Sequence, residues 1–134
     1  MASLALALLA IGCRTNAAGD YELDLEETKK AVAKSAAENP EDAPMKDATL
    51  KMYSAMRLSV TLHEDGKMTS RTSLAMPDAP PGEGKQDGTW KLDQGRVVIS
   101  VTDGDTVCQV DAKRLRCARE AYNKLQGSYV LRRK

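Results

Sequence analysis

The sequence predicts a mainly β fold of the α+β class. We expect an antiparallel meander or a small up-and-down barrel of about seven to eight strands, with one or two helices inserted after the first strand. Apolar and polar residues alternate with a period of two from residue 56 onward, which is the spacing of half-buried strands. Turn signals such as EDG, QG and DG separate these stretches at short intervals and favour hairpins. With 134 residues, the chain has room for one hydrophobic core.

The first elements precede the hairpins. Alternation over residues 21–25 predicts a short first strand. Asp24, followed three residues later by Glu27, resembles a capping box, so a helix should begin there and end before the Asn-Pro pair at 39–40. A second helical segment is expected over residues 45–54, after the turn-rich stretch NPEDAP.

Residues 56–62 alternate cleanly and predict a strand that ends at the turn EDG. A three-residue loop with Gly66 in the left-handed conformation sets Leu62 opposite Met68. A two-residue loop would slip the register by one position and send Arg71 into the core. The hydrophobic pattern therefore favours the three-residue loop.

Residues 76–87, MPDAPPGEGKQD, predict an exposed irregular loop because Pro and Gly dominate them. Hairpins centred on 94–95, 103–104 and 112–113 follow, and a last strand over 128–132 is expected to pair with the first strand and close the sheet. The expected cross-strand pairs are Leu92 with Val97, Trp90 with Ile99, Ile99 with Cys108, Val97 with Val110, Val110 with Leu115, and Cys108 with Cys117.

The cysteines predict one disulfide. Cys108 and Cys117 fall opposite each other at a non-hydrogen-bonded position, where side chains approach closely enough for a cross-strand bridge. Cys13 is then left over, and an even pair remains, as exported proteins prefer. The alternative is two free thiols in the core.

The N-terminal segment resembles that of bacterial lipoproteins. The run 4–11 has eight apolar residues, too few for a membrane span but enough for the apolar part of a signal peptide. The following AIGC resembles a lipobox, whose cysteine is lipidated and becomes the mature N-terminus. The resemblance implies a signal peptide at 1–12, a lipidated Cys13 with a short tether at 13–19, and one domain at 20–134.

Two alternatives to the lipobox remain open. Ordinary signal peptidase could cut near Ala17 or Ala18, or the segment could be the uncleaved N-terminal helix of a cytosolic protein.

The stretches GDYELD, GTWKL, VVISV and YVLRR, with a helical segment and a DG hairpin between them, resemble small lipocalin-like domains of exported bacterial lipoproteins. The resemblance implies an antiparallel barrel or strongly curved sheet, tethered through Cys13 in the bacterial cell envelope, on the periplasmic side or at the cell surface. The strand count and the one-faced apolar pattern favour a small apolar ligand or lipid as partner. The expected pocket residues are Met56, Leu58, Trp90, Ile99 and Val110. The alternative is an envelope-interaction or hydrolase-inhibitor lipoprotein that acts through the loop 76–87 or the basic C-terminal end.

No catalytic signature is visible. The chain lacks a phosphate-binding glycine loop, HExxH and GxSxG, and its one histidine, His63, is expected on the solvent side of a hairpin. The sequence therefore predicts no enzyme, no cofactor and no metal site. Methionines near His63 leave copper(I) as an alternative, although Met is also the expected core filler in a chain without Phe.

Charge is distributed unevenly along the chain. Residues 19–49 carry nine acidic and four basic side chains, whereas 111–134 carry eight basic and two acidic ones. We expect the two ends to neutralise each other across the fold; the alternative is a basic surface for anionic lipid or an acidic partner. A nucleic-acid partner is not expected, because no base-stacking aromatics are interleaved with the arginines.

Overall fold

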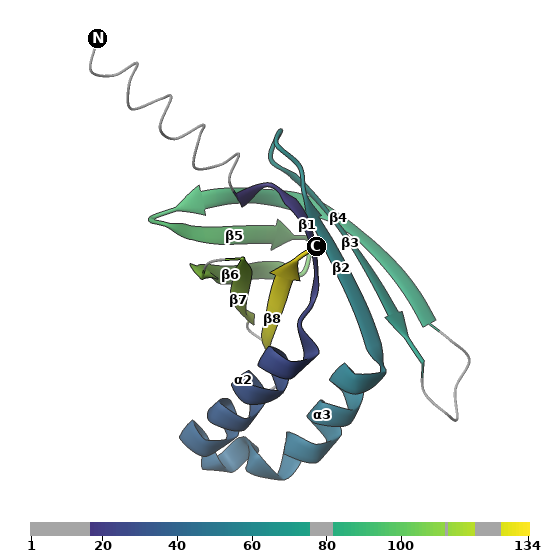
Figure 1. Cartoon of the computed structure of the whole chain (residues 1–134), viewed down its shortest axis with the longest axis vertical. Coiled ribbons are helices and arrows are strands. Elements are labelled where there is room, and N and C mark those ends of the chain that lie inside the picture. The colour runs from purple at the N-terminus through teal and green to yellow at the C-terminus, as the bar shows by residue number, and fades with distance from the viewer. Residues whose placement is uncertain (1–16, 76–81, 112, 120–126) are drawn as a thin grey trace.

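Eight antiparallel strands close into a barrel in chain order in the computed structural model, which describes residues 17–75, 82–111, 113–119 and 127–134 (Figure 1). The described strands are β1 (Gly19–Leu23), β2 (Met56–Leu62), β3 (Lys67–Leu74), β4 (Gly82–Asp93), β5 (Arg96–Val101), β6 (Gly104–Asp111), β7 (Arg114–Arg119) and β8 (Ser128–Arg133). Between β1 and β2 lie α2 (Leu25–Glu38), the 3-10 helix η1 (Pro40–Met45) and α3 (Lys46–Ala55). The predicted fold class is confirmed, including the closure of the sheet by β8 against β1.

Helix α2 begins at the predicted cap. The carboxylate of Asp24 accepts a hydrogen bond from the amide of Glu27 at 3.1 Å, which satisfies one of the free amides of the first turn. Burial by itself raises the pKa of Asp24, but the amide of Glu27 and the guanidinium of Arg114 outweigh it and hold the pKa below its usual value. The Asp24 carboxylate is therefore ionised at neutral pH.

The same end of α2 also completes the barrel wall. Strand β1 ends at Leu23, so the edge of β8 beyond that point has no neighbouring strand. The amide of Asp24 donates to the carbonyl of Val130 at 2.8 Å. The hydroxyl of Thr28 accepts from the amide of Val130 at 2.9 Å and donates to its carbonyl at 3.3 Å. The first turns of α2 thus satisfy polar backbone groups that would otherwise be buried without partners.

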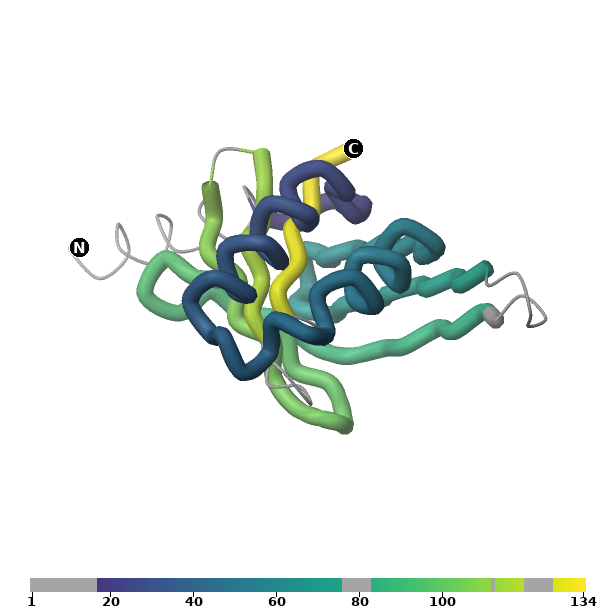
Figure 2. Tube along the Cα trace, turned by 90° about the horizontal axis from the view of Figure 1, so that it is seen from below, coloured from purple at the N-terminus to yellow at the C-terminus, as the bar shows by residue number. Residues whose placement is uncertain are grey.

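The two α-helices lie side by side across one end of the barrel (Figure 2). A small apolar cluster joins them to the barrel; its buried members are Val32, Ala36 and Tyr53, with Leu23, Leu25, Leu50, Met52, Met56 and Tyr129 packed around them. None of the helices in the described residues is long and apolar enough to span a membrane.

Most of the predicted hairpin registers are confirmed. Leu62 lies opposite Met68, and Gly66 has the left-handed conformation (φ 91°) that this register requires. Trp90 lies opposite Ile99, and the β6–β7 pairs, including Val110 with Leu115, are as predicted.

The β5–β6 hairpin differs by two residues from its prediction. The turn is formed by residues 102–103, and Val101 lies opposite Gly104, whose φ of 141° suits glycine. Val97 therefore pairs with Cys108, and the predicted pairs of Ile99 with Cys108 and of Val97 with Val110 are wrong. A two-residue slip keeps the same face inward, so the hydrophobic pattern does not distinguish the two registers.

Strand β4 begins earlier than predicted. Residues 82–87, expected in an irregular loop, pair with β3 along its length, and the two strands form a long hairpin (Figure 1). These residues form a strand because β3 offers backbone hydrogen-bond partners, and this pairing does not depend on which side chains β4 carries. Residues 76–81 of the predicted loop lie outside the described residues.

Gly88 lies at the point along β4 where pairing with β3 ends and pairing with β5 begins. The β3 register covers β4 up to Thr89, and the β5 register begins there. A Cβ atom at position 88 would lie 2.4 Å from the carbonyl oxygen of Ser100. Only glycine allows the two backbones to approach this closely.

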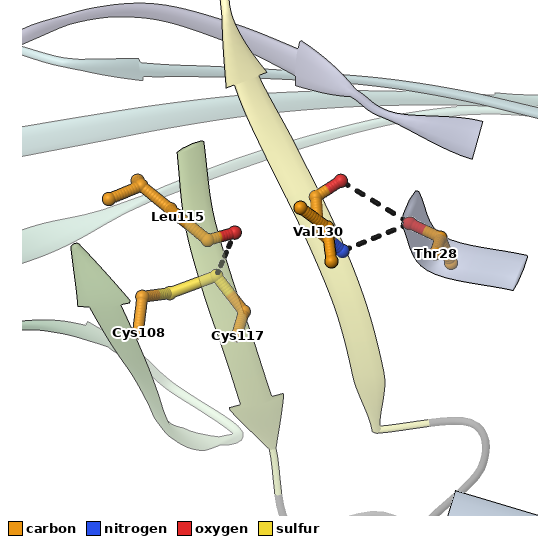
Figure 3. Close-up of a disulfide and its surroundings, with 5 residues drawn as sticks. All are labelled: Thr28, Cys108, Leu115, Cys117 and Val130. Atoms are coloured by element: carbon orange, nitrogen blue, oxygen red, sulfur yellow. Dashed lines mark hydrogen bonds between the residues drawn. A yellow bond between two sulfur atoms is a disulfide. The ribbon is translucent and has the colours of Figure 1, made fainter. Parts of the chain in front are cut away.

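The barrel core gathers in the half that contains the N-terminal end of β1. Its buried members are Ala17, Tyr21, Val60, Leu62, Met68, Trp90, Val97, Ile99, Cys108, Leu115, Cys117 and Leu131. The predicted disulfide is confirmed: Cys108 and Cys117 are bonded within this core, with their Cα atoms 4.0 Å apart (Figure 3). Leu115 lies next to the bridge, and its carbonyl oxygen is 3.8 Å from the sulfur of Cys117.

Among the described residues, three arginines of the basic C-terminal end form ion pairs with acidic side chains of the N-terminal part, so the charge pattern predicted a partial neutralisation that is found. Arg114 pairs with Asp24 at 3.0 Å, and Arg132 pairs with Glu22 at 2.9 Å. Arg116 reaches carboxylates on α2 and on β6. These arginines therefore connect β7 and β8 to β1 and to the start of α2.

Candidate functional site

A cavity of about 460 Å³ occupies the half of the barrel that faces the helices, and it is partly open to solvent. Its volume lies within the range of roughly 300–1,000 Å³ that is typical of small-molecule sites. The lining residues are Met52, Tyr53, Met56, Leu58, Val60, Met68, Ser70, Thr72, Gln86, Ile99, Val101, Thr106, Arg119 and Tyr129.

The cavity exists because the inward side chains change size along the barrel. In the core half, large side chains such as Trp90 and Leu62 fill the interior. In the other half, β3 turns the small Ser70 and Thr72 inward. Helix α3 covers the space that this leaves, with Tyr53 at its inner surface.

Most of the cavity wall is apolar. Met56 and Leu58 come from β2, and Ile99 and Val101 come from β5. The unbranched thioether of Met56 adapts to ligands of different shape at little cost. The wall is therefore suited to an apolar molecule and does not specify its outline.

Four polar side chains from four elements gather at one end of the cavity; we call Tyr53, Thr106, Arg119 and Tyr129 the polar corner. The hydroxyls of Tyr129 and Thr106 are hydrogen bonded to each other, and Thr106 lies directly across from Arg119 in the β6–β7 register. Burial raises the pKa of Tyr129, while the Thr106 hydroxyl and the Arg119 charge lower it in part. Burial also raises the pKa of Tyr53, and Tyr129 adds to that effect. Both phenols are thus neutral at physiological pH and keep their protons as hydrogen-bond donors.

Arg119 is the one formally charged side chain among the described residues that line the cavity. Within the described part of the chain, no carboxylate forms an ion pair with it, in contrast to Arg114, Arg116 and Arg132. Arg119 and Tyr129 also line a groove of about 1160 Å³ on the outside of the barrel, between α2 and strands β6 to β8. The polar corner therefore stands where the cavity meets the surface.

Three of the expected pocket residues, Met56, Leu58 and Ile99, line the cavity. Trp90 does not: it is 2% exposed in the filled half of the barrel, where its indole nitrogen donates to the carbonyl of His63 at 2.7 Å. Val110 is 47% exposed, because the shifted β5–β6 register leaves it beyond the end of β5.

Sequence reasoning missed the polar corner. Arg119 is separated by an even number of residues from Leu115 and Cys117 along β7. The alternation of inward and outward side chains therefore already indicated that this arginine faces inward. Tyr53 gave no such signal, since only the packing of α3 against the barrel end brings it to the cavity.

The described residues contain no group of three or more His, Cys, Asp or Glu side chains that could hold a metal ion. The copper(I) alternative also needed His63 and Met68 together. Met68 is buried inside the barrel, whereas His63 is exposed, with its Nε2 atom 3.3 Å from the Thr69 hydroxyl. The proposed lipidation residue, Cys13, lies outside the described residues.

No family model and no curated protein sequence matches the chain. Among solved structures, a protein from Shewanella oneidensis that is inferred to be a lipoprotein is 18% identical over 59% of this chain and 74% of that one, with a TM-score of 0.43. The wild-type fluorescent protein UnaG is 13% identical over 90% of this chain and 98% of its own, with a TM-score of 0.38. At such TM-scores these likenesses carry no argument about ligand or location.

Proposed function

We propose that this chain is a non-catalytic binding module that holds a small apolar ligand inside its barrel. The observation that carries the proposal is the cavity of about 460 Å³, which an otherwise well-packed barrel leaves between its filled half and α3. Unfilled apolar space costs stability, and a ligand that fills it regains the lost contacts. Small inward side chains at Ser70 and Thr72 maintain that space.

Titration with Nile red, a neutral apolar fluorophore, tests this function. We expect saturable binding with one site per chain and a blue-shifted emission. Ser70→Leu places a larger apolar side chain in the cavity and should weaken binding by about tenfold or more, while the melting temperature stays equal or rises. Ser73→Leu makes the same change on the outer face of β3, where Ser73 lines a surface groove, and serves as the control.

Equal binding by the two variants, or emission that never saturates, would contradict the cavity as the binding site. Unaltered far-ultraviolet circular dichroism in both variants would show that the barrel itself is intact.

We also propose that the chain is exported and tethered to a bacterial membrane through Cys13. The Cys108–Cys117 disulfide supports export, because disulfides persist in oxidising compartments. Ala17 is already 6% exposed in the core and accepts a hydrogen bond from the Tyr21 hydroxyl at 2.7 Å. The folded part thus begins before the expected position 20, which shortens the proposed tether to residues 14–16.

Such a tether spans at most about 10 Å when fully extended, so the barrel would stay close to the membrane surface. Mass spectrometry of the mature protein should find an acyl mass on Cys13 and a loss of two protons from the other two cysteines. An intact Met1 with three free thiols would overturn the export proposal.

A further inference from the structure

We propose that the ligand of the cavity is an anionic amphiphile, whose acidic head group binds Arg119 while its apolar chain extends into the barrel. This inference rests on the proposed function and specifies the chemical class of the ligand. It follows from a single cationic side chain placed among neutral ones, at the point where an apolar cavity meets the surface.

The Arg119 guanidinium is a charged group beside an apolar wall. Arg119 is half-buried on the inward face of β7, next to the apolar cavity wall. A cation in such a place is stabilised by an anionic partner, and the described residues provide none. Three arginines on the outer face of β7 and β8, Arg114, Arg116 and Arg132, each have one.

The groups around that charge are suited to an acidic head group. The guanidinium offers several N–H donors in a planar fork that matches a carboxylate or phosphate. The hydroxyls of Tyr129 and Thr106 are beside it, and Tyr129 is close enough to Arg119 for the two to interact electrostatically. Tyr53 completes the group from α3. The polar corner is therefore rich in hydrogen-bond donors and holds no formal negative charge to repel an acid.

The cavity runs from the polar corner to apolar residues farther inside the barrel. Arg119 and Tyr129 border both the cavity and the outer groove, whereas Met56, Leu58 and Ile99 line the cavity alone. A ligand with its head at the polar corner can place its chain against these apolar residues. A fully neutral ligand would supply no counter-charge to Arg119, and a cationic one would be repelled by it.

Displacement of Nile red by decanoate and by 1-decanol tests the inference, because the two ligands share a chain and differ in head group. We expect wild-type protein to bind decanoate about tenfold more tightly than decanol. Arg119→Gln should remove this preference and leave the decanol affinity within about twofold, whereas Arg119→Lys should retain part of it. Arg71→Gln, on the outer face of β3, is the matched control and should behave as wild type.

The outcomes separate the two proposals. Equal affinity of wild-type protein for decanoate and decanol, measured before any variant is made, would overturn the anionic head group while the apolar site stands. If Nile red shows no saturable binding to the wild-type protein, the binding function itself is overturned. Decyl phosphate in the same assay distinguishes the acid: tighter binding than decanoate identifies a phosphate head group, and weaker binding identifies a carboxylate. Either result supports an anionic ligand.

Discussion

Reduction of the Cys108–Cys117 disulfide should destabilise the barrel by a predictable amount. The two cysteines are nine residues apart, so the bond closes a loop of about ten residues in the unfolded chain. For a loop of that length, the chain-entropy model gives about 2.7 kcal/mol at 25 °C. Both sulfurs are buried in the core, so the native protein should resist mild reductants.

Urea unfolding of the oxidised and the reduced protein measures this loss. With a slope of about 1–3 kcal/mol/M, the midpoint should fall by about 0.9–2.7 M in the reduced protein, while the slope stays unchanged. A domain with a typical stability of about 5–15 kcal/mol would remain folded after reduction. Cys13→Ser in the oxidised state is the control and should not move the midpoint. An unchanged midpoint on reduction would refute the loop-closure reasoning.

Three further changes test the framework around the cavity. Gly88→Ala should destabilise the barrel by about 3 kcal/mol or more, because its Cβ would lie 2.4 Å from a backbone oxygen of β5; a thermal melt close to that of wild type would contradict the close approach. Thr28→Val leaves the backbone of Val130 without a hydroxyl partner and should cost about 1–3 kcal/mol in urea unfolding, whereas Thr28→Ser should cost much less; equal effects would argue against the hydrogen bonds. Because the pKa of Asp24 is lowered by folding, its ionised form stabilises the protein fully above about pH 4, and this stability is lost as the pH falls through the lower, folded pKa. Asp24→Asn should flatten the pH dependence of the melting temperature below about pH 4, and an unaltered profile would show that another group is responsible.

Sequence pattern was sufficient wherever structure follows from neighbours along the chain. The cap at Asp24, the turn at Gly66 and the position of Cys108 opposite Cys117 each depend on local geometry, and each is found as predicted. The β5–β6 register failed because a slip of two residues preserves the inward face, so local pattern contains no information that would choose between the two.

The candidate site depended more strongly on tertiary structure. The alternation of apolar and polar residues along the strands indicates that the side chains of Met56, Leu58 and Ile99 face inward. These three residues do line the cavity. Their neighbours Tyr53 and Tyr129 come from elements far apart in the chain, and only barrel closure and the packing of the helices bring them together.

By itself, the sequence determined an antiparallel meander or small barrel with one or two inserted helices and a pair of facing cysteines, because periodicity, turn residues and caps act over a few residues. It could not show where the barrel interior is filled and where it is empty. Whether a level of the interior is filled depends on the sizes of the side chains that meet there, such as the large Trp90 at one level and the small Ser70 at another. These side chains meet only after the strands close into a barrel. Alternation along β7 already indicates that Arg119 faces inward, but only the tertiary structure decided that it lies at the empty half, because it pairs the other two arginines of β7 with carboxylates and leaves this one at the cavity.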